Sequence, residues 1–144
     1  MKPKAFIDRL DDAKIVAAIA EAERKSSGEI CVYVSSRKRE DALDAARRRF
    51  HRLGMTQTRH RNGVLIYFAP LTRKFAVWGD EGVHQKCGET FWPEIVAQMT
   101  PSLETGKFTE AVVFAVTKVG EVLAQHFPRQ PDDRNELPDR VVRD

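Results

Sequence analysis

Few cysteines, no long apolar run and no signal-like N-terminus limit what this 144-residue chain can be. Its two cysteines, Cys31 and Cys87, are too few for a disulfide-stabilised scaffold, and we expect buried thiols. No stretch approaches the roughly 20 apolar residues that a membrane span needs. The N-terminal segment MKPKAFIDRLDDAK lacks the apolar core and cleavage site of a secretory signal. These absences predict a cytoplasmic protein without a membrane span.

Length and composition predict one folded domain followed by a tail. With 42% hydrophobic and 31% charged residues, the chain has the composition of a soluble globular protein. We assign residues 1–128 to an α/β domain. Residues 129–144, RQPDDRNELPDRVVRD, are rich in proline and charge and poor in apolar residues, so we expect an extended or partly disordered tail.

The most informative stretch is RNGVLIYFAPLTRKFAVWGD, residues 61–80. Residues 64–69 are an unbroken run of strand-forming apolar residues, which is typical of a strand buried on both faces. Residues 75–78 form a second such run after a short polar connection. Two runs separated by about four turn-type residues predict an antiparallel hairpin.

The preceding segments predict that this hairpin belongs to a larger α/β sheet. Residues 29–35 alternate as a strand, and residues 42–53 have helical periodicity with Asp41 as the N-cap. The buried stripe that we predict for this helix is Leu43, Ala46, Phe50 and Leu53. Strand, helix and strand in this order predict a right-handed βαβ crossover with parallel strands.

Three further helices complete the predicted fold. Apolar periodicity places them near residues 12–25, 91–103 and 109–126, with a short helical turn at 82–87. We therefore predict a three-layer α/β/α sandwich around a small mixed sheet, made of the βαβ crossover plus the antiparallel hairpin.

Positive charge is concentrated between Arg37 and Arg61. This segment has nine Lys or Arg against three acidic residues, a local charge of +6 compared with +3 for the whole chain. Arg47, Arg48 and Arg52 are therefore candidates for binding an anion. The alternative is a solvated helix face. Nucleic acid is an unfavoured ligand, because the total charge is modest and aromatic residues are not interleaved with the arginines.

Several ordered motifs resemble the TPM domain family, in its bacterial, signal-less branch. The resemblance extends from about Ile15 to Asp139 and depends on Ser27-Gly28-Glu29-Ile30, Asn62-Gly63-Val64-Leu65, Gly79-Asp80-Glu81-Gly82, Gly106 with Phe108, and the tail motif DRNELPD. It implies a three-layer α/β fold. It also implies association with divalent cations such as calcium, with weak acid-phosphatase activity, and with the upkeep of membrane complexes.

Two features of the chain depart from this family pattern. Many relatives have an acidic residue directly before the Asn-Gly pair, where this chain has Arg61, and a positive charge there should weaken a cation site. Many relatives also have a signal sequence and a membrane anchor, and this chain has neither motif. We therefore expect an interaction or assembly domain with protein partners, including a membrane-associated complex.

Strand directions predict that polar residues meet at one rim of the sheet, where the two parallel strands begin and the returning strand ends. We call this the first rim. Glu29, Asn62, Asp80 and Glu81 are its candidate ligands for calcium or another divalent cation. If the family's phosphatase activity operates here, Asp80 is the candidate catalytic residue. The alternative is that Asn62-Gly63 and Gly79-Asp80 are ordinary turn residues.

The opposite rim, the second rim, lies at the carboxyl ends of the parallel strands, where such sheets commonly bind ligands. A phosphate there would lie near Ser35, Ser36 and the helix that begins after Asp41. Asp41 and Asp44 would repel an anion at that helix terminus, so we interpret them as caps. The sequence has no Asp-x-Asp motif and no glycine-rich phosphate loop, which weighs against a dedicated phosphatase.

Overall fold

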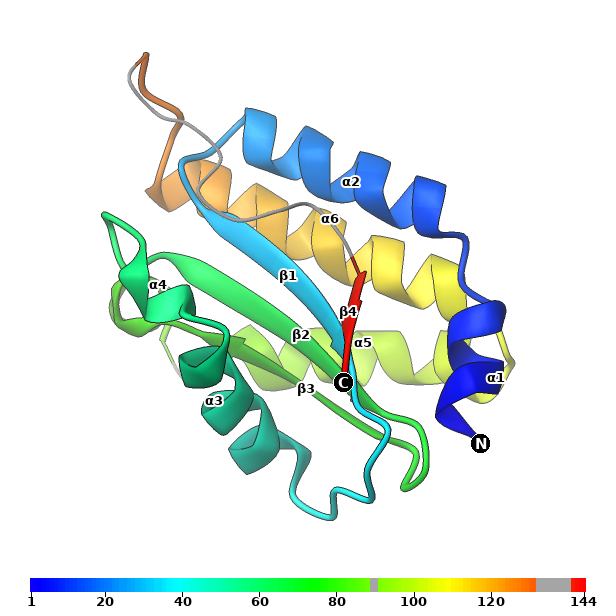
Figure 1. Cartoon of the computed structure of the whole chain (residues 1–144). Helices are drawn as coiled ribbons and strands as arrows, with labels where there is room; N and C mark the ends of the chain where they lie inside the picture. The colour runs from blue at the N-terminus through cyan, green and yellow to red at the C-terminus, as the bar shows by residue number, and fades with distance from the viewer. Residues whose placement is uncertain (89–90, 132–140) are drawn as a thin grey trace.

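A computed structural model describes residues 1–88, 91–131 and 141–144 of the chain (Figure 1). In chain order, its helices and strands are α1 (Pro3–Asp8), α2 (Asp12–Arg24), β1 (Glu29–Val34), α3 (Ala42–Arg52), the short 3-10 helix η1 (Met55–Gln57), β2 (Gly63–Ala69), β3 (Lys74–Gly79), α4 (Glu81–Cys87), α5 (Phe91–Glu104), α6 (Phe108–His126) and β4 (Val141–Arg143).

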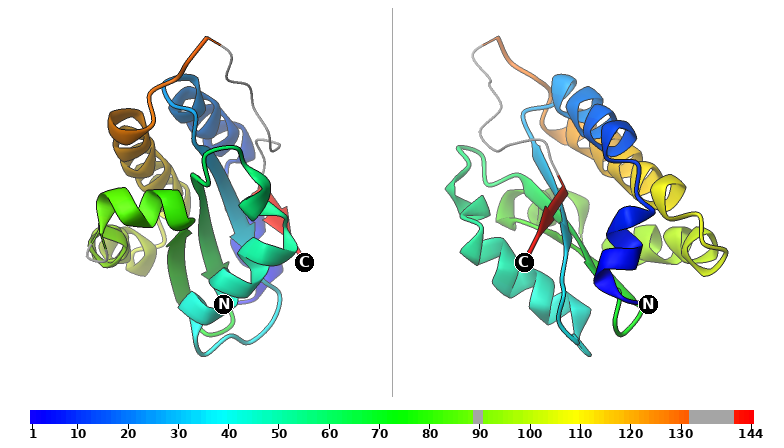
Figure 2. Two further views of the ribbon diagram at one scale, coloured as in Figure 1. Left: turned by 90° about the vertical axis from the view of Figure 1, so that its left-hand side faces the viewer. Right: turned by 45° about the vertical axis from the view of Figure 1, so that its right-hand side comes forward.

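The strands form one mixed sheet with the order β3-β2-β1-β4. β1 pairs in parallel with β2 through the α3 crossover, and β2 pairs antiparallel with β3 through the hairpin. Helix α3 covers one face of the sheet, whereas α2, α5 and α6 cover the other (Figures 1 and 2). The predicted three-layer α/β/α sandwich with its crossover and hairpin is therefore confirmed.

Successive side chains of the buried strands point to opposite faces of the sheet, which produces a separate apolar core on each face. Ile30, Val32 and Val34 of β1 point into the larger core beneath α2, α5 and α6. Cys31 and Tyr33 point the other way, into the smaller core beneath α3. Every residue of β1 and β2 is buried, which is why both strands are almost continuously apolar.

Local capping explains where two of the helices begin. The side chain of Asp11 accepts a hydrogen bond from the backbone N–H of Lys14, and Asp41 accepts one from Asp44. Both carboxylates thereby satisfy an amide that the first turn of a helix leaves unpaired. The expected capping role of Asp41 is confirmed, and its side chain is committed to its own helix.

The buried stripe predicted for α3 is wrong at Leu43, which is 52% exposed. The residues of α3 that face the sheet are Ala42, Ala45, Ala46 and Phe50. Three small alanines bring the helix close to the strands and leave Phe50 to fill the remaining space. The larger leucine is turned toward solvent at the start of the helix.

Three elements have no counterpart in the sequence analysis: helix α1, the short helix η1 and strand β4. Helix α1 adds Phe6, whose ring packs against Phe68 and Phe108 at centroid distances of 5.2 and 4.9 Å. Strand β4 pairs in parallel with β1, with Val141 opposite Val32.

Among the described residues, no helix is both long and apolar enough to cross a membrane.

The α3 face provides a test of the packing. Phe50→Ala should destabilise the protein by about 3–5 kcal/mol, because the ring is fully buried and its loss leaves a cavity. Leu43→Ala on the same helix should change stability by less than about 0.5 kcal/mol. Urea unfolding followed by circular dichroism measures both. Equal losses for the two variants would contradict the orientation of α3.

Candidate functional site

The first rim brings together residues from three neighbouring strands. Glu29 is paired with Gly63, and the backbone N–H of Asp80 donates to the Gly63 carbonyl at 2.9 Å. Glu29, Gly63 and Asp80 therefore lie in one row across the sheet. The predicted meeting of two strand starts with the end of a returning strand is confirmed.

A two-pronged ion pair between Arg61 and Asp80 dominates this rim. Arg61 Nε donates to Asp80 Oδ2 at 2.8 Å, and Arg61 Nη2 donates to Oδ1 at 2.9 Å. The Asp80 side chain is only 5% exposed, whereas that of Arg61 is 45% exposed. This geometry is the fork-to-fork arrangement that makes arginine–carboxylate pairs strong. The hydrogen bond to Asp80, reinforced by charge attraction, raises the pKa of the Arg61 guanidinium.

Asp80 also begins helix α4. Its Oδ1 accepts a second hydrogen bond, from the backbone N–H of Glu81 at 2.8 Å. The Glu81 carboxylate lies on the solvent side, with Oε2 at 3.7 Å from Arg61 Nη1. One guanidinium thus faces two carboxylates.

The backbone of Arg61 is held as closely as its side chain. The N–H of Gly82 donates to the Arg61 carbonyl at 2.9 Å. A Cβ at position 82 would lie 2.6 Å from the His60 carbonyl oxygen and 2.7 Å from that of Arg61, so only glycine fits there. Arg61 itself has a φ of 50°, in the left-handed region that costs a non-glycine residue free energy.

Glu29 and Asn62 lie on the same rim without contacting Asp80 directly. Glu29 is separated from Asp80 by Gly63, and the distance spanned by two strand spacings is roughly 10 Å. A Cβ at Gly63 would lie 3.4 Å from both Met55 Cε and Phe50 Cζ, so apolar side chains fill this gap. Asn62 is fully buried, and its Nδ2 donates to Ser27 Oγ at 3.0 Å. Within the described part of the chain, Asn62 Oδ1 has no hydrogen-bond donor.

The charged side chains on the first rim are paired with one another, with Arg61 facing both Asp80 and Glu81. The described residues include no group of three or more His, Cys, Asp or Glu side chains placed to hold a metal ion together. Instead, the guanidinium of Arg61 occupies the position beside Asp80 and Glu81 that a cation would take. The carboxylates of Asp80 and Glu81 can therefore bind one positively charged group at a time, and in this structure that group is the Arg61 guanidinium.

The second rim contains an ion pair that the sequence analysis did not predict. Asp144 follows β4, and its Oδ1 accepts from the backbone N–H of Ser36 at 2.6 Å while its Oδ2 accepts from Ser35 Oγ at 3.2 Å. Arg49 Nη2 of α3 lies 3.7 Å from Asp144 Oδ2. The distance of 109 residues between Ser35 and Asp144 along the chain explains why no local pattern indicated this contact.

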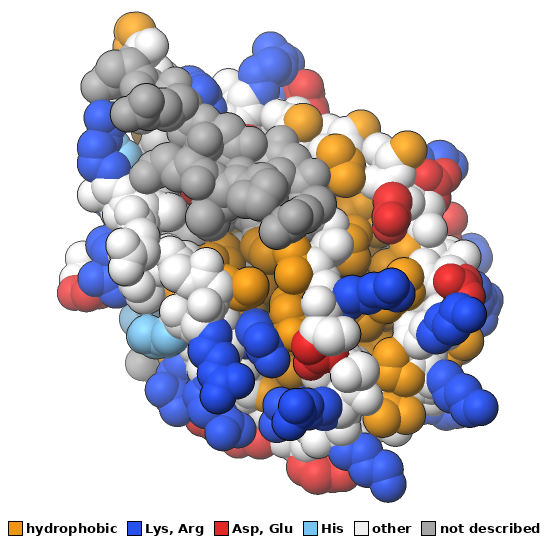
Figure 3. Space-filling view, in the orientation of Figure 1, with side chains coloured by type: hydrophobic (Ala, Val, Ile, Leu, Met, Phe, Trp, Pro, Cys, Tyr) orange, Lys and Arg blue, Asp and Glu red, His pale blue; other side chains and the backbone are white. Residues whose placement is uncertain are grey.

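The exposed face of α3 carries the candidate anion-binding arginines. Figure 3 shows Lys and Arg side chains gathered over this helix. Arg47 and Arg48 are both paired with Asp44, at 2.7 and 3.1 Å, so part of their charge is neutralised. Arg52 is exposed in the next turn. These surface pairs leave a moderately basic face, and its ligand remains a prediction.

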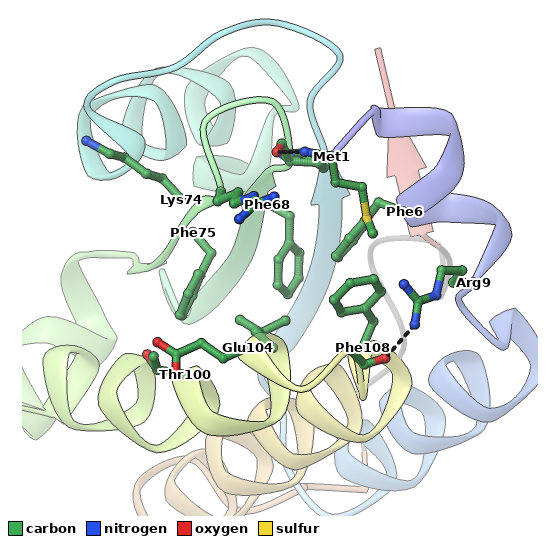
Figure 4. A pocket seen from close by; sticks show the side chains of 13 residues that line it. Met1, Phe6, Arg9, Phe68, Lys74, Phe75, Thr100, Glu104 and Phe108 are labelled. Carbon is green, nitrogen blue, oxygen red and sulfur yellow. Dashed lines mark hydrogen bonds between the residues drawn. The ribbon is translucent and has the colours of Figure 1, made fainter.

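Two hollows lie beside the sheet. A cavity of about 520 Å³ is lined by the aromatic rings of Phe6, Phe68, Phe75 and Phe108, with Arg9 stacked over Phe108 at 4.5 Å (Figure 4). A second hollow, of about 900 Å³, follows β3 between α3 and α5. We call it the β3 groove; its apolar lining includes Leu43, Trp78, Trp92 and Val96.

Fold and rims together define a small α/β sandwich domain with a mixed sheet and ion-paired polar rims. A family model described as TPM domain matches residues 1–122, and the chain belongs to this family. It is 34% identical to the BA42 protein of the psychrophilic bacterium Bizionia argentinensis, covers 92% of both chains and superposes with a TM-score of 0.84.

A second solved structure shares the fold. The N-terminal domain of a protein from P. gingivalis is 17% identical, with a TM-score of 0.65 over 84% of this chain and 82% of that one. A comparison with curated proteins found no match. The suspected family is therefore confirmed, and the activity is a separate question.

Tyr33, close to the second rim, provides a spectroscopic test. Burial, followed by the negative charge of Asp144, raises the pKa of Tyr33 to about 12. In a Tyr67→Phe variant Tyr33 is the only remaining tyrosine, so its phenolate absorbance can be titrated alone. The midpoint should lie near 12. Because the folded pKa exceeds the value of about 10 in an unfolded chain, Tyr33 should favour folding below about pH 10 and lose this contribution as the pH rises further. A midpoint near that of free tyrosine would contradict the burial.

Proposed function

We propose that this TPM domain is an interaction and assembly module whose first rim binds calcium or another divalent cation in exchange for Arg61. The observation that carries the proposal is the bidentate grip of Asp80 on the Arg61 guanidinium. A carboxylate that already holds a positive group in a fixed, nearly buried position is suited to a metal ion.

Asp80 and Glu81 are the ligands best placed for such an ion. They are adjacent in sequence, face the same guanidinium, and supply the hard oxygen atoms that calcium and magnesium prefer. Asn62 belongs to the same rim and is the candidate for completing the shell through its buried Oδ1. Glu29 lies roughly 10 Å from Asp80, too far to bind the same ion, so water would supply the remaining ligands. The ion would compete with Arg61 for Asp80, which makes binding weaker than in a site without a resident cation.

The β3 groove supports the interaction part of the proposal. Since the Asp80 N–H points to β2, alternation along β3 directs the backbone groups of Phe75, Val77 and Gly79 toward the open side of the sheet. An edge strand beside an apolar hollow is suited to receiving an extended segment of a partner protein. We propose that partners, including members of a membrane-associated complex, bind there.

A weak acid phosphatase that uses Asp80 is the less supported alternative. Both oxygens of Asp80 already accept hydrogen bonds, from Arg61 and from the Glu81 amide, which lowers their nucleophilicity. An Asp80 that served as a metal ligand would still require Arg61 to leave. Turnover of a simple phosphomonoester that disappears in Asp80→Asn would favour this alternative over binding alone.

Removing the resident cation tests the proposed site. Arg61→Gln should bind calcium about tenfold more tightly than the unmodified protein, because a competing charge-assisted pair of about 1.4 kcal/mol or more is lost. Isothermal titration calorimetry at fixed ionic strength measures the change. Adding Asp80→Asn to Arg61→Gln should abolish the gain.

Arg52→Gln is the matched control, because it removes the same charge from the exposed face of α3. It should leave calcium affinity unchanged within about twofold, since Arg52 is exposed to solvent, where surface charges are screened and contribute little. If Arg61→Gln and Arg52→Gln behave alike, the first rim is not a cation site.

The β3 groove has its own test. Peptides selected from a random library for binding to the folded protein should shift the amide resonances of Phe75, Val77 and Gly79 most strongly. Leu43→Lys at the edge of the groove should weaken their binding, whereas Leu71→Lys, at another exposed hydrophobic residue that lies outside the groove, should not. Shifts confined to helix surfaces would rule out pairing with β3.

A further inference from the structure

The second rim has the composition of an anion receptor. Its donors are the backbone N–H of Ser36, the hydroxyl of Ser35 and the guanidinium of Arg49. Ser35 is fully buried, so its hydroxyl is held in one place by the surrounding structure. Three donors of different kinds, from a strand end, a loop and a helix, converge on one position.

Packing holds the charged donor toward this position. The guanidinium of Arg49 lies over the ring of Tyr33, with Cζ 4.8 Å from the ring centroid. Tyr33 in turn is stacked on Tyr67 at 5.4 Å, and both rings are buried. The arginine side chain is only 21% exposed, so its orientation is set by packing rather than by solvent. A preorganised donor loses less entropy when an anion binds.

The location follows the general rule for ligand sites in α/β sheets. β1, β2 and β4 run in parallel, and the second rim lies beyond their carboxyl ends. The loop after β1 adds the charges of Arg37, Lys38 and Arg39. The helix dipole of α3 is not needed, because Asp41 already caps that helix.

In the present conformation the receptor holds the protein's own carboxylate. Asp144 accepts from Ser36 at 2.6 Å, a short hydrogen bond of the kind that charged acceptors make. Burial acts to raise the pKa of the Asp144 carboxyl, but the hydrogen bonds from Ser36 and Ser35 oppose it and the net shift is downward. The receptor therefore prefers the charged form of its occupant.

Asp144 is held by a short element. β4 has three residues, pairs with β1 at the edge of the described sheet and is half-buried or exposed throughout. Short edge segments with few buried contacts open locally at little cost in free energy. Withdrawal of Asp144 would uncover the three donors while β1 and α3 remain folded.

We propose that the second rim is a phosphate-binding site in which Asp144 acts as an internal competitor. A phosphate group has three acceptor oxygens and a charge of about −1.5 to −2 at neutral pH, so it satisfies three donors better than a carboxylate does. The ligand is inorganic phosphate or the phosphate of a small phosphomonoester. This site is separate from the cation site on the first rim, and neither proposal depends on the other.

Titration with inorganic phosphate at constant ionic strength tests the proposal on the full chain. Asp144→Ala should bind phosphate about tenfold more tightly than the unmodified protein, because the competing charged hydrogen bonds are removed. The Ser36 amide resonance should move during the titration. Adding Arg49→Gln to Asp144→Ala should reverse the gain. Asp8→Ala removes an exposed acid from α1 and should have no effect.

A second variant tests whether a gain in phosphate affinity comes from removing the charge of Asp144 or from loosening β4. Asp144→Asn keeps the shape of the side chain without its charge and should give the same order of affinities. If neither variant binds phosphate more tightly than the unmodified protein, or if the Ser36 amide does not respond, Asp144 is a structural latch and the proposal is overturned. Tighter binding of phenyl phosphate than of inorganic phosphate would identify a phosphomonoester as the ligand, and the reverse order would identify the free ion.

Discussion

The backbone pairing of β1, β2 and β3 is the constraint on which the rest of the structure depends. Because β1 and β2 are parallel and β3 returns beside β2, two strand starts and one strand end must meet at the same rim. The residues flanking these strands are polar because the chain has to leave the buried sheet there. Both faces of β1 and β2 are occupied by apolar cores, so within the sheet charged groups lie at the two rims.

Each rim carries a charge that the protein itself neutralises. On the first rim the guanidinium of Arg61 is ion-paired with the carboxylate of Asp80. On the second rim the carboxylate of Asp144 accepts hydrogen bonds from Ser35 and Ser36 and is ion-paired with Arg49. Burying the Asp80 carboxylate without a partner would cost free energy, so Arg61 stabilises this carboxylate as well as competing for it. A ligand at either rim would have to displace the charged side chain already bound there, Arg61 or Asp144. The affinity for the ligand would therefore depend on the free energy of breaking that internal ion pair.

Much of the fold could be predicted from local patterns. Apolar runs identified β1, β2 and β3, and an acidic residue before helical periodicity identified the cap at Asp41. The stripe of α3 was misjudged at Leu43, because helical spacing alone does not say how closely a helix approaches a sheet. Helix α1 was missed since it is short and its burial depends on contacts between Phe6 and distant aromatic rings.

By itself the sequence determined strands β1, β2 and β3, the crossover, the hairpin and the rim on which Glu29, Asn62, Asp80 and Glu81 lie, since these follow from residue periodicity and strand direction. Only the tertiary structure decided which of these residues touch. It placed Gly63, Met55 and Phe50 between Glu29 and Asp80, and it turned the side chain of Arg61 onto Asp80. It also brought Asp144 to Ser36, because contacts across 108 residues depend on how the whole chain closes and leave no periodic signal.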